Sequence, residues 1–198
     1  MSVSRQSAAS RSREETRRRL LNSGVELFAR HGLNGVTTHD IARGAGVASG
    51  TFYLHFPDKS ALFHEIAADT EAALRARIEE ATAFAADLRG AVRAQAEALL
   101  DFAAENRDLV CILFGPDGEQ AAGTELLDAF AKSIEEGRRH AIATGEMPRE
   151  IDAAVLSQAL VGMISRVLVW WTTHPDPVDR DTVIETLTRI QLSGTHPA

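Results

Sequence analysis

Apolar residues recur at helical spacing along most of the chain, and no stretch alternates strictly between apolar and polar residues as a half-buried strand would. Glycines and prolines separate the helical segments, because glycine tolerates the conformation that ends a helix and proline stops one. The pattern predicts helices over residues 13–31, 38–45, 49–56, 58–84, 87–105, 119–144, 151–173 and 178–192, with a short apolar piece at 109–114. We therefore expect an all-α fold.

Residues 36–59 predict two short helices joined by a tight turn. Thr38 stands where an N-cap would satisfy the free amides of the first helix, and Gly46 follows its last apolar residue. The second helix opens at Ala48 or Ser49 and is stopped by Pro57. Two short helices about such a turn form a helix-turn-helix, whose second helix lies in the DNA major groove.

Small residues open the second helix, where the backbone must approach the base edges. Hydroxyl groups there can bond to bases, and small apolar groups can contact thymine methyls. The predicted base contacts are Ala48, Ser49, Gly50, Thr51 and Leu54. The alternative is an ordinary helical hairpin with an aromatic core, and Phe52 and Phe56 suit a core position in either case.

The same segment carries a resemblance to a known family. Residues 37–62 follow the pattern T-x-x-x-I-A-x-x-A-G-V-x-x-G-T-F-Y-x-H-F-x-x-K-x-x-L, and residues 20–32 follow L-L-x-x-G-V-x-L-F-x-x-x-G. This resembles the DNA-binding signature of the tetracycline-repressor (TetR) family. The resemblance covers residues 15–65 and implies a three-helix DNA-binding domain followed by a larger helical domain for ligand binding and dimerisation.

The resemblance also implies which residues contact phosphate oxygens. By motif position these are Thr38, Arg43, Tyr53, His55 and Lys59. The basic first helix adds Arg17 and Arg18. Gly24, inside that helix, costs about 0.5–1 kcal/mol relative to alanine, which predicts close contact with a neighbouring helix.

We expect three parts along the chain. Residues 1–12 are polar and Ser-rich and predict a disordered basic arm; residues 13–60 form the DNA-binding domain, and residues 61–198 form a regulatory and dimerisation domain. The helix predicted at 58–84 is long enough to join the two domains, so its movement could transmit a signal; a rigid spacer is the alternative.

Charge is divided unevenly along the chain. The net charge is −7, yet residues 1–64 hold nine Lys and Arg against five Asp and Glu, a balance of +4, which leaves −11 for the remainder. A basic head on an acidic body would orient the protein on DNA and keep the body away from it.

The helix predicted at 151–173 is apolar on more than one side, whereas a surface helix needs one apolar stripe. One side can cover the core while another meets a second copy of the chain, and the predicted dimer contacts are Val155, Ala159, Gly162 and Val169. A fully buried central helix is the alternative. Dimers place two recognition helices on a palindrome, and the resemblance implies dimerisation through the last two long helices.

Bulky apolar residues of the C-terminal part can line a cavity for a hydrophobic small molecule, or they can simply fill the core. The candidates are Phe84, Phe102, Cys111, Phe114, Met163, Trp170 and Trp171. The resemblance, rather than the apolar pattern, favours a ligand pocket.

Enzymatic chemistry is not indicated. The seven histidines form no H-x-x-x-H or H-E-x-x-H pair, there is no P-loop, and the single Cys111 has no adjacent base, so we expect no cofactor and no metal. The sequence shows no secretory signal and no apolar run that approaches a membrane span, which favours the cytoplasm and no membrane partner.

Together these observations predict a transcriptional regulator that binds double-stranded DNA. The predicted form is a repressor, a homodimer on a palindromic operator, released by a small hydrophobic effector. Activation remains an alternative. Two rivals are a catalytic body tethered by the helix-turn-helix and a dimeric adaptor for other proteins, and neither explains the run from Gly50 to Lys59.

Overall fold

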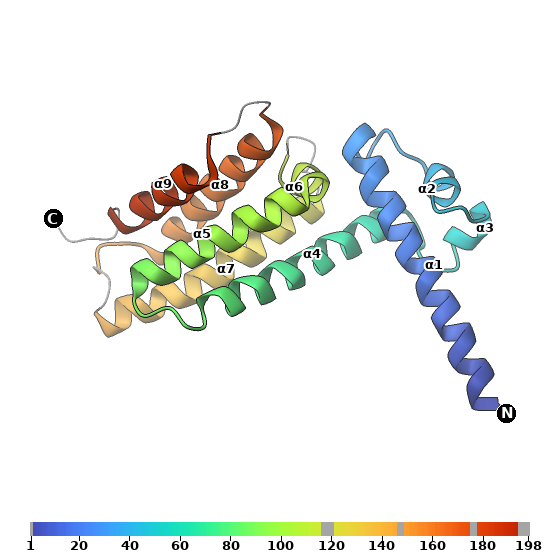
Figure 1. Ribbon diagram of the computed structural model, residues 1–198, viewed down its shortest axis with the longest axis horizontal. Helices are drawn as coiled ribbons and strands as arrows, with labels where there is room; N and C mark the ends of the chain where they lie inside the picture. Colours follow the sequence, from blue (N-terminus) through green and yellow to red (C-terminus); the bar gives the residue numbers. More distant parts are fainter. Residues whose placement is uncertain (1, 116–120, 146–148, 175–177, 194–198) are drawn as a thin grey trace. The chain divides into compact units, whose positions relative to one another are not determined.

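The computed structural model describes residues 2–115, 121–145, 149–174 and 178–193. Within these ranges the chain forms nine α-helices and no strand (Figure 1). The helices are α1 Ser2–His31, α2 Thr38–Gly44, α3 Ser49–Phe52, α4 Lys59–Thr82, α5 Leu88–Glu105, α6 Arg107–Phe114, α7 Ala121–Thr144, α8 Ala153–Thr173 and α9 Arg180–Ser193. The prediction of an all-α fold is confirmed.

The first helix begins much earlier than the apolar pattern predicts. α1 starts at Ser2, so a helix occupies most of the segment for which the sequence predicts a disordered arm. This segment contains Ala, Arg and Gln, which favour helix, and no Gly or Pro precedes Gly24. The segment has no apolar stripe at helical spacing. A prediction that depends on such a stripe cannot detect a helix that is supported by intrinsic propensity alone.

The helix-turn-helix differs from the prediction at its caps. The N-cap of α2 is Thr37 rather than Thr38: the Asp40 amide donates to Thr37 Oγ1 at 3.1 Å, and the Thr37 amide donates to Asp40 Oδ2 at 3.2 Å. Gly46 has φ +66°, the left-handed conformation expected at the turn. α3 ends at Phe52, before the point set by Pro57, because the chain continues there as a succession of turns.

The chain divides into two compact units, Met1–Asp69 and Thr70–Ala198, which we call the N-terminal and C-terminal units. The division falls inside α4, later than the expected boundary at 60/61, because Leu62 and Ile66 of α4 are buried beside α1. A Cβ on Gly24 would lie 2.5 Å from Leu62 Cδ2, so the prediction that Gly24 marks a close helix contact is confirmed.

In the C-terminal unit, α5, α7, α8 and α9 run alongside one another (Figure 1). α8 packs against α5, α6 and α7, and α9 packs against α5. The core between them is built from Leu74, Ala96, Leu99, Leu100, Phe102, Ala103, Val110, Ile164, Leu168, Val169, Val183, Ile184 and Leu187.

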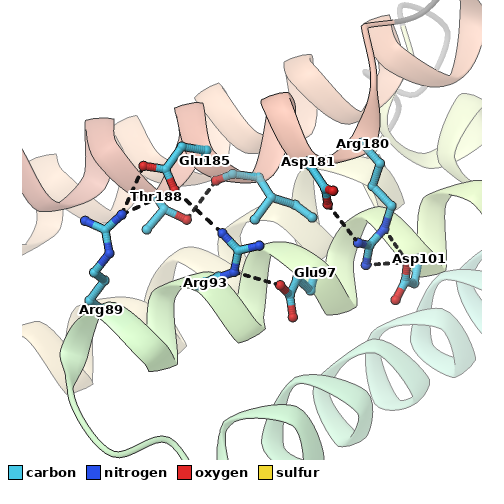
Figure 2. Close-up of polar contacts among 9 residues, drawn as sticks. Arg89, Arg93, Glu97, Asp101, Arg180, Asp181, Glu185 and Thr188 are labelled. Carbon is cyan, nitrogen blue, oxygen red and sulfur yellow. Dashed lines mark hydrogen bonds and ion pairs between the residues drawn. The ribbon is translucent and has the colours of Figure 1, made fainter.

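A row of ion pairs joins α9 to α5 (Figure 2). Arg89 lies 3.0 Å from Glu185, Arg180 lies 2.7 Å from Asp101, and Arg93 approaches Glu185 at 3.6 Å. Such partly exposed pairs are each worth less than about 1 kcal/mol. Together they specify which face of α9 meets α5.

α8 is long and apolar enough, by length and composition, to cross a membrane. The expectation that no run approaches a membrane span is therefore wrong for this helix, whose mean hydropathy over the window is 1.6. The core helix of a globular protein meets the same criterion. Only 39% of the 18-residue segment of α8 with this hydropathy is buried within the chain. α8 therefore also presents apolar surface that a single copy leaves exposed.

Candidate DNA interface and ligand cavity

The segment around α3 presents small side chains to solvent. Ala48, Ser49 and Gly50 are exposed, Thr51 is partly buried, and Leu54 is 71% exposed. A Cβ added to Gly50 would meet no atom within 4 Å, so the fold itself leaves room for a side chain there. Because these exposed side chains are small, the backbone of α3 can come close to another molecule.

Two buried aromatic rings hold α3 from the inside. Phe52 and Phe56 are 0% and 2% exposed, and their ring centroids are 5.8 Å apart. The Arg17 guanidinium lies over the Phe56 ring at 4.5 Å from the centroid, a cation–π contact. Because the rings point inward, residues 48–50 point outward.

Hydroxyl groups from both helices meet beside this surface. The Oγ1 of Thr38 and the phenol oxygen of Tyr53 are hydrogen-bonded at 2.9 Å, and Tyr53 is 58% exposed. Each hydroxyl keeps further capacity to bond a phosphate oxygen. The pair thus links the start of α2 to the end of α3 on the exposed side.

Arg43 is exposed near the end of α2 and pairs with Asp40 at 2.6 Å. The pKa of Asp40 is lowered, first by the Thr37 side chain that donates to it and then by the Thr37 amide, with Arg43 contributing less. Arg18 is likewise exposed and pairs with Glu15 at 3.1 Å. Both arginines are placed where they could exchange a carboxylate for a phosphate.

Arg17 is directed into the N-terminal unit. Its Nε donates to Glu65 at 2.8 Å, a second nitrogen contacts the same carboxylate, and Nη1 donates to the His55 carbonyl at 3.1 Å. With its ring contact to Phe56, Arg17 joins α1, α4 and the segment after α3. These contacts make it a positioning residue, which differs from its predicted phosphate role.

Lys59 is also turned inward. Its ammonium group donates to the carbonyl oxygens of Leu33 at 2.8 Å and Val36 at 3.0 Å, both in the loop between α1 and α2. Two of its three N–H groups are used in this way. Lys59 therefore fixes the entry to α2, and this differs from the predicted phosphate contact.

His55 is partly buried, and its Nδ1 atom is buried without a hydrogen-bond partner. Burial lowers the pKa of His55, and the nearby charges of Arg13 and Arg17 lower this pKa further. The ring is therefore neutral near pH 7, which does not suit the predicted contact with a phosphate anion.

Arg19 is a residue that the sequence reasoning missed. Its guanidinium donates to the carbonyl oxygen of Ala45 and, at 3.3 Å, to that of Gly46. It holds the turn between α2 and α3 from α1. The run Arg17 to Arg19 contains no local signal that separates these three roles, because only the packing of α1 decides which side each residue faces.

The C-terminal unit contains a partly open apolar cavity of about 50 Å³. Its walls come from α4, α5, α6, α7 and α8, and Gln95 and Ser165 contribute polar side chains. The other lining residues are Leu74, Ile78, Leu99, Phe114, Leu127, Phe130, Ile134, Val161, Ile164 and Leu168. A larger hollow of about 420 Å³ adjoins the cavity across Ile78, Gln95, Ile134 and Ile164.

Comparison with known proteins now bears on these two sites. Residues 20–66 match the profile of the bacterial regulatory proteins of the tetR family, and this match contains α2, α3 and the residues around them. Residues 20–66 are thus a TetR-family segment. The predicted helix-turn-helix is thereby confirmed, and the chain is a transcriptional regulator.

The relatives of this chain match over different lengths. SrpR, a transcriptional regulator of Pseudomonas putida, is 26% identical over 158 residues, which is 78% of this chain and 74% of SrpR. AcrR of Shigella flexneri is 43% identical over 53 residues, but these are 27% of this chain and 25% of AcrR. Similarity is therefore strongest in a short segment.

Solved structures extend the likeness over most of the chain. The crystal structure of the regulator FadR from Bacillus subtilis, in complex with stearoyl-CoA, has a TM-score of 0.77 and 20% identity, and the match covers 90% of this chain and 98% of FadR. At this identity the likeness shows the fold alone.

Of the predicted pocket residues, Phe114 lines the apolar cavity. Phe84 does not, because its side chain is 96% exposed just beyond α4, and Phe102 is buried in the core. Cys111 is partly buried, and burial raises the pKa of its thiol. The lining comes instead from Leu, Ile and Val residues, which sequence analysis cannot separate from ordinary core.

Three further candidates lie around α8. Met163 and Trp171 pack against the core, and the indole N–H of Trp171 donates to the Val178 carbonyl at 2.8 Å. The ring of Trp170 stacks on His174 with centroids 4.9 Å apart. None of the three lines the cavity or the adjoining hollow as the structure describes them.

The predicted dimer residues separate into two groups. Val155, Ala159 and Gly162 are exposed on one face of α8, and Val155 is 69% exposed. Val169 is 5% exposed and belongs to the core of the C-terminal unit, so it cannot contact a second copy without unfolding. Nothing lies within 4 Å of a Cβ added to Gly162, which leaves this face open to close approach.

The described part of the chain contains no group of three His, Cys, Asp or Glu residues that could hold a metal ion. SrpR and AcrR are both regulators by name.

Proposed function

We propose that this regulator is a repressor, that it occupies a palindromic operator as a homodimer, and that a small apolar effector releases it. The observation that carries the DNA-binding part is the exposed surface of α3, where small side chains surround a glycine that the fold does not require. A close backbone approach to DNA explains this glycine.

On this proposal the residues around α3 contact the bases and their neighbours contact phosphates. Ala48, Ser49, Gly50, Thr51 and Leu54 face the groove. The phosphate contacts are the exposed residues Thr38, Arg43, Tyr53 and Arg18, whereas Arg17, His55 and Lys59 hold the unit in shape. Their roles follow from where each side chain is directed.

A homodimer follows from the small size of this surface. One short helix reaches few base pairs, whereas two copies related by a two-fold axis span two half-sites. The exposed face of α8 with Val155, Ala159 and Gly162 is the proposed contact, because small side chains let two helices approach closely. A second copy would also cover the apolar surface that α8 leaves exposed.

Release by an effector requires a physical connection between cavity and DNA-binding unit. α4 provides one: Leu74 and Ile78 line the cavity, and Leu62 and Ile66 of the same helix pack beside α1. An effector that favours one position of α4 would weaken operator binding by its coupling energy, typically about 1–3 kcal/mol. The stearoyl chain of the stearoyl-CoA bound by FadR supports an effector with an apolar part.

The remaining parts of the proposal are simpler. We assign residues 13–60 to DNA binding and 61–198 to regulation and dimerisation. The protein acts in the cytoplasm, where its DNA is, without catalysis and without a cofactor.

The test is selection of operator DNA by the full-length protein from genomic fragments of its own organism. We expect palindromic fragments whose binding shows a dimer in mobility shifts, and lower transcription from the selected promoter when the protein is added to a reconstituted reaction. Enrichment of unrelated fragments would overturn the proposal. Increased transcription would identify an activator.

A further inference from the structure

The apolar cavity and the adjoining hollow share one polar side chain, that of Gln95 on α5. The cavity of about 50 Å³ and the hollow of about 420 Å³ also share three isoleucines, so one elongated molecule can occupy both. A volume of several hundred Å³ is the usual size of a small-molecule site. Gln95 therefore lies where the two parts of the site meet.

The position of Gln95 is one at which the helical pattern calls for an apolar side chain. Ala91 and Val92 lie one turn before it on α5 and line the hollow, and Leu99 lies one turn after it and lines the cavity. Residues three or four apart share a face of a helix. Gln95, which is partly buried, thus interrupts an apolar stripe that faces both spaces.

The carboxamide of Gln95 has no hydrogen-bond partner among the residues that the structure describes. Solvent satisfies an open carboxamide, but a ligand that fills the space removes this solvent. A carboxamide left without a hydrogen bond then costs free energy, which a bond to the ligand restores. The site therefore favours a ligand with an oxygen within reach of Gln95 over a pure hydrocarbon.

The other polar side chains of these walls are either bonded within the chain or exposed. Thr82 and Ser165 donate to carbonyl oxygens of their own helices at 2.8 Å and 3.2 Å. Arg138 and Gln191 also have interactions within the chain. Ser133 is exposed and lines only the larger hollow.

We propose that the effector is an aliphatic molecule with a hydrogen-bonding oxygen, and that the Gln95 amide donates to this oxygen while the aliphatic part fills the apolar cavity. This inference rests on the proposed release by an effector and narrows its chemistry. Carboxylate, carbonyl and hydroxyl oxygens all accept such a bond, and different probes distinguish them.

Two substitutions of Gln95 and one control separate this role from simple packing. Gln95→Met removes the carboxamide and keeps an unbranched side chain of similar length. Gln95→Glu removes the donor, keeps an acceptor and adds a negative charge at about pH 8. Ser165→Ala is the control, because it removes the other polar group of the apolar cavity, a hydroxyl that already donates to a backbone carbonyl.

The experiment measures binding to the full-length protein by calorimetry at about pH 8, without DNA and below micelle-forming concentrations. The probes are decanoate, decan-1-ol and butylbenzene, an apolar molecule without oxygen, and each probe is compared with itself across the variants. We expect Gln95→Met to weaken binding of the two oxygen-bearing probes at least about fivefold and to bind butylbenzene as tightly as the wild type or more tightly.

The other two variants should give different patterns. Gln95→Glu should lose decanoate through repulsion between like charges and keep decan-1-ol, whose hydroxyl can donate to the new carboxylate. Ser165→Ala should bind all three probes as the wild type does. If only one oxygen-bearing probe binds the wild type, it identifies the oxygen as carboxylate or hydroxyl.

Three results would overturn the inference: binding of the oxygen-bearing probes by folded Gln95→Met equal to that of the wild type, equal weakening of all three probes, or no binding of either oxygen-bearing probe to the wild type. Circular dichroism shows whether Gln95→Met folds. If it does not, undiminished decanoate binding or loss of decan-1-ol binding by Gln95→Glu would count against the inference. If the probes bind through Gln95 but leave operator binding unchanged, the proposed release fails, whereas the assignment of Gln95 stands.

Discussion

A glycine at position 50 lowers the stability of the fold but favours the proposed binding to DNA. Glycine weakens a helix by about 0.5–1 kcal/mol relative to alanine, and open space surrounds the position of a Cβ. Gly50→Ala should therefore raise the free energy of unfolding by that amount and lower operator affinity by at least about tenfold through a clash with DNA. Urea unfolding and mobility shifts measure the two effects.

Gly137→Ala in α7 is the control for this variant, because its Cβ also meets open space. It should stabilise the protein and leave operator binding unchanged. If Gly50→Ala bound the operator as tightly as the wild type does, α3 would not be the helix in the groove.

Arg43 and Lys59 carry the same charge in different surroundings. Arg43 is exposed, so Arg43→Ala should weaken DNA binding and reduce the slope of log affinity against log salt by about 1. Lys59→Ala should lower stability and affinity while leaving the slope unchanged, since its ammonium bonds to carbonyls within the chain. A reduced slope with unchanged stability would place Lys59 on a phosphate.

His55 should make the protein sensitive to acid. Its pKa is lowered from 6.5 by burial, so below about pH 6.5 the unfolded chain binds more protons than the folded chain. Stability is therefore lost as pH falls through this value and below it. His55→Gln should flatten that loss in urea unfolding between about pH 5 and 8. Equal pH dependence of His55→Gln and wild type would contradict this account.

At the scale of elements, α8 has a buried face and an open face. Val155→Asp puts a charge on the open face, where a monomer tolerates it and a close-packed dimer does not. We expect a folded monomer at micromolar concentration by sedimentation, with weaker binding to a palindrome. As a control, Lys132→Asp changes the charge at an exposed position of α7, and this variant should remain a dimer. An unchanged dimer in Val155→Asp would move the interface away from α8.

α4 is the element that belongs to both units, and its stiffness should set how strongly they communicate. Ala72 and Ala73 are exposed between the buried residues Ile66 and Leu74. Replacing both by glycine weakens the helix by about 1 kcal/mol per residue.

The whole molecule should then keep both activities and lose their coupling. Decanoate, a straight-chain fatty acid, serves as the probe for the effector. In Ala72→Gly/Ala73→Gly, operator binding and decanoate binding should each stay near wild type, while the effect of decanoate on operator affinity falls. Mobility shifts with and without decanoate measure this ratio, and Ala143→Gly in α7 is the control. Undiminished coupling in the double variant would show that the signal does not depend on an intact α4.

The sequence by itself determined the helical fold, the helix-turn-helix and the TetR-family segment, because these depend on local spacing: apolar residues at helical period, a glycine at the turn and a motif within residues 20–66. It also located Gly24 as a contact point, since a glycine inside a helix needs a reason.

Only the tertiary structure decided which way individual side chains face. Arg17 and Lys59 turn inward while Arg43 stays exposed, and Val169 is core while Val155 is not. These outcomes depend on which helix packs against which, over separations that no local pattern records. The cavity belongs to the same class, because it is formed by residues from five helices whose apolar stripes are indistinguishable along the chain.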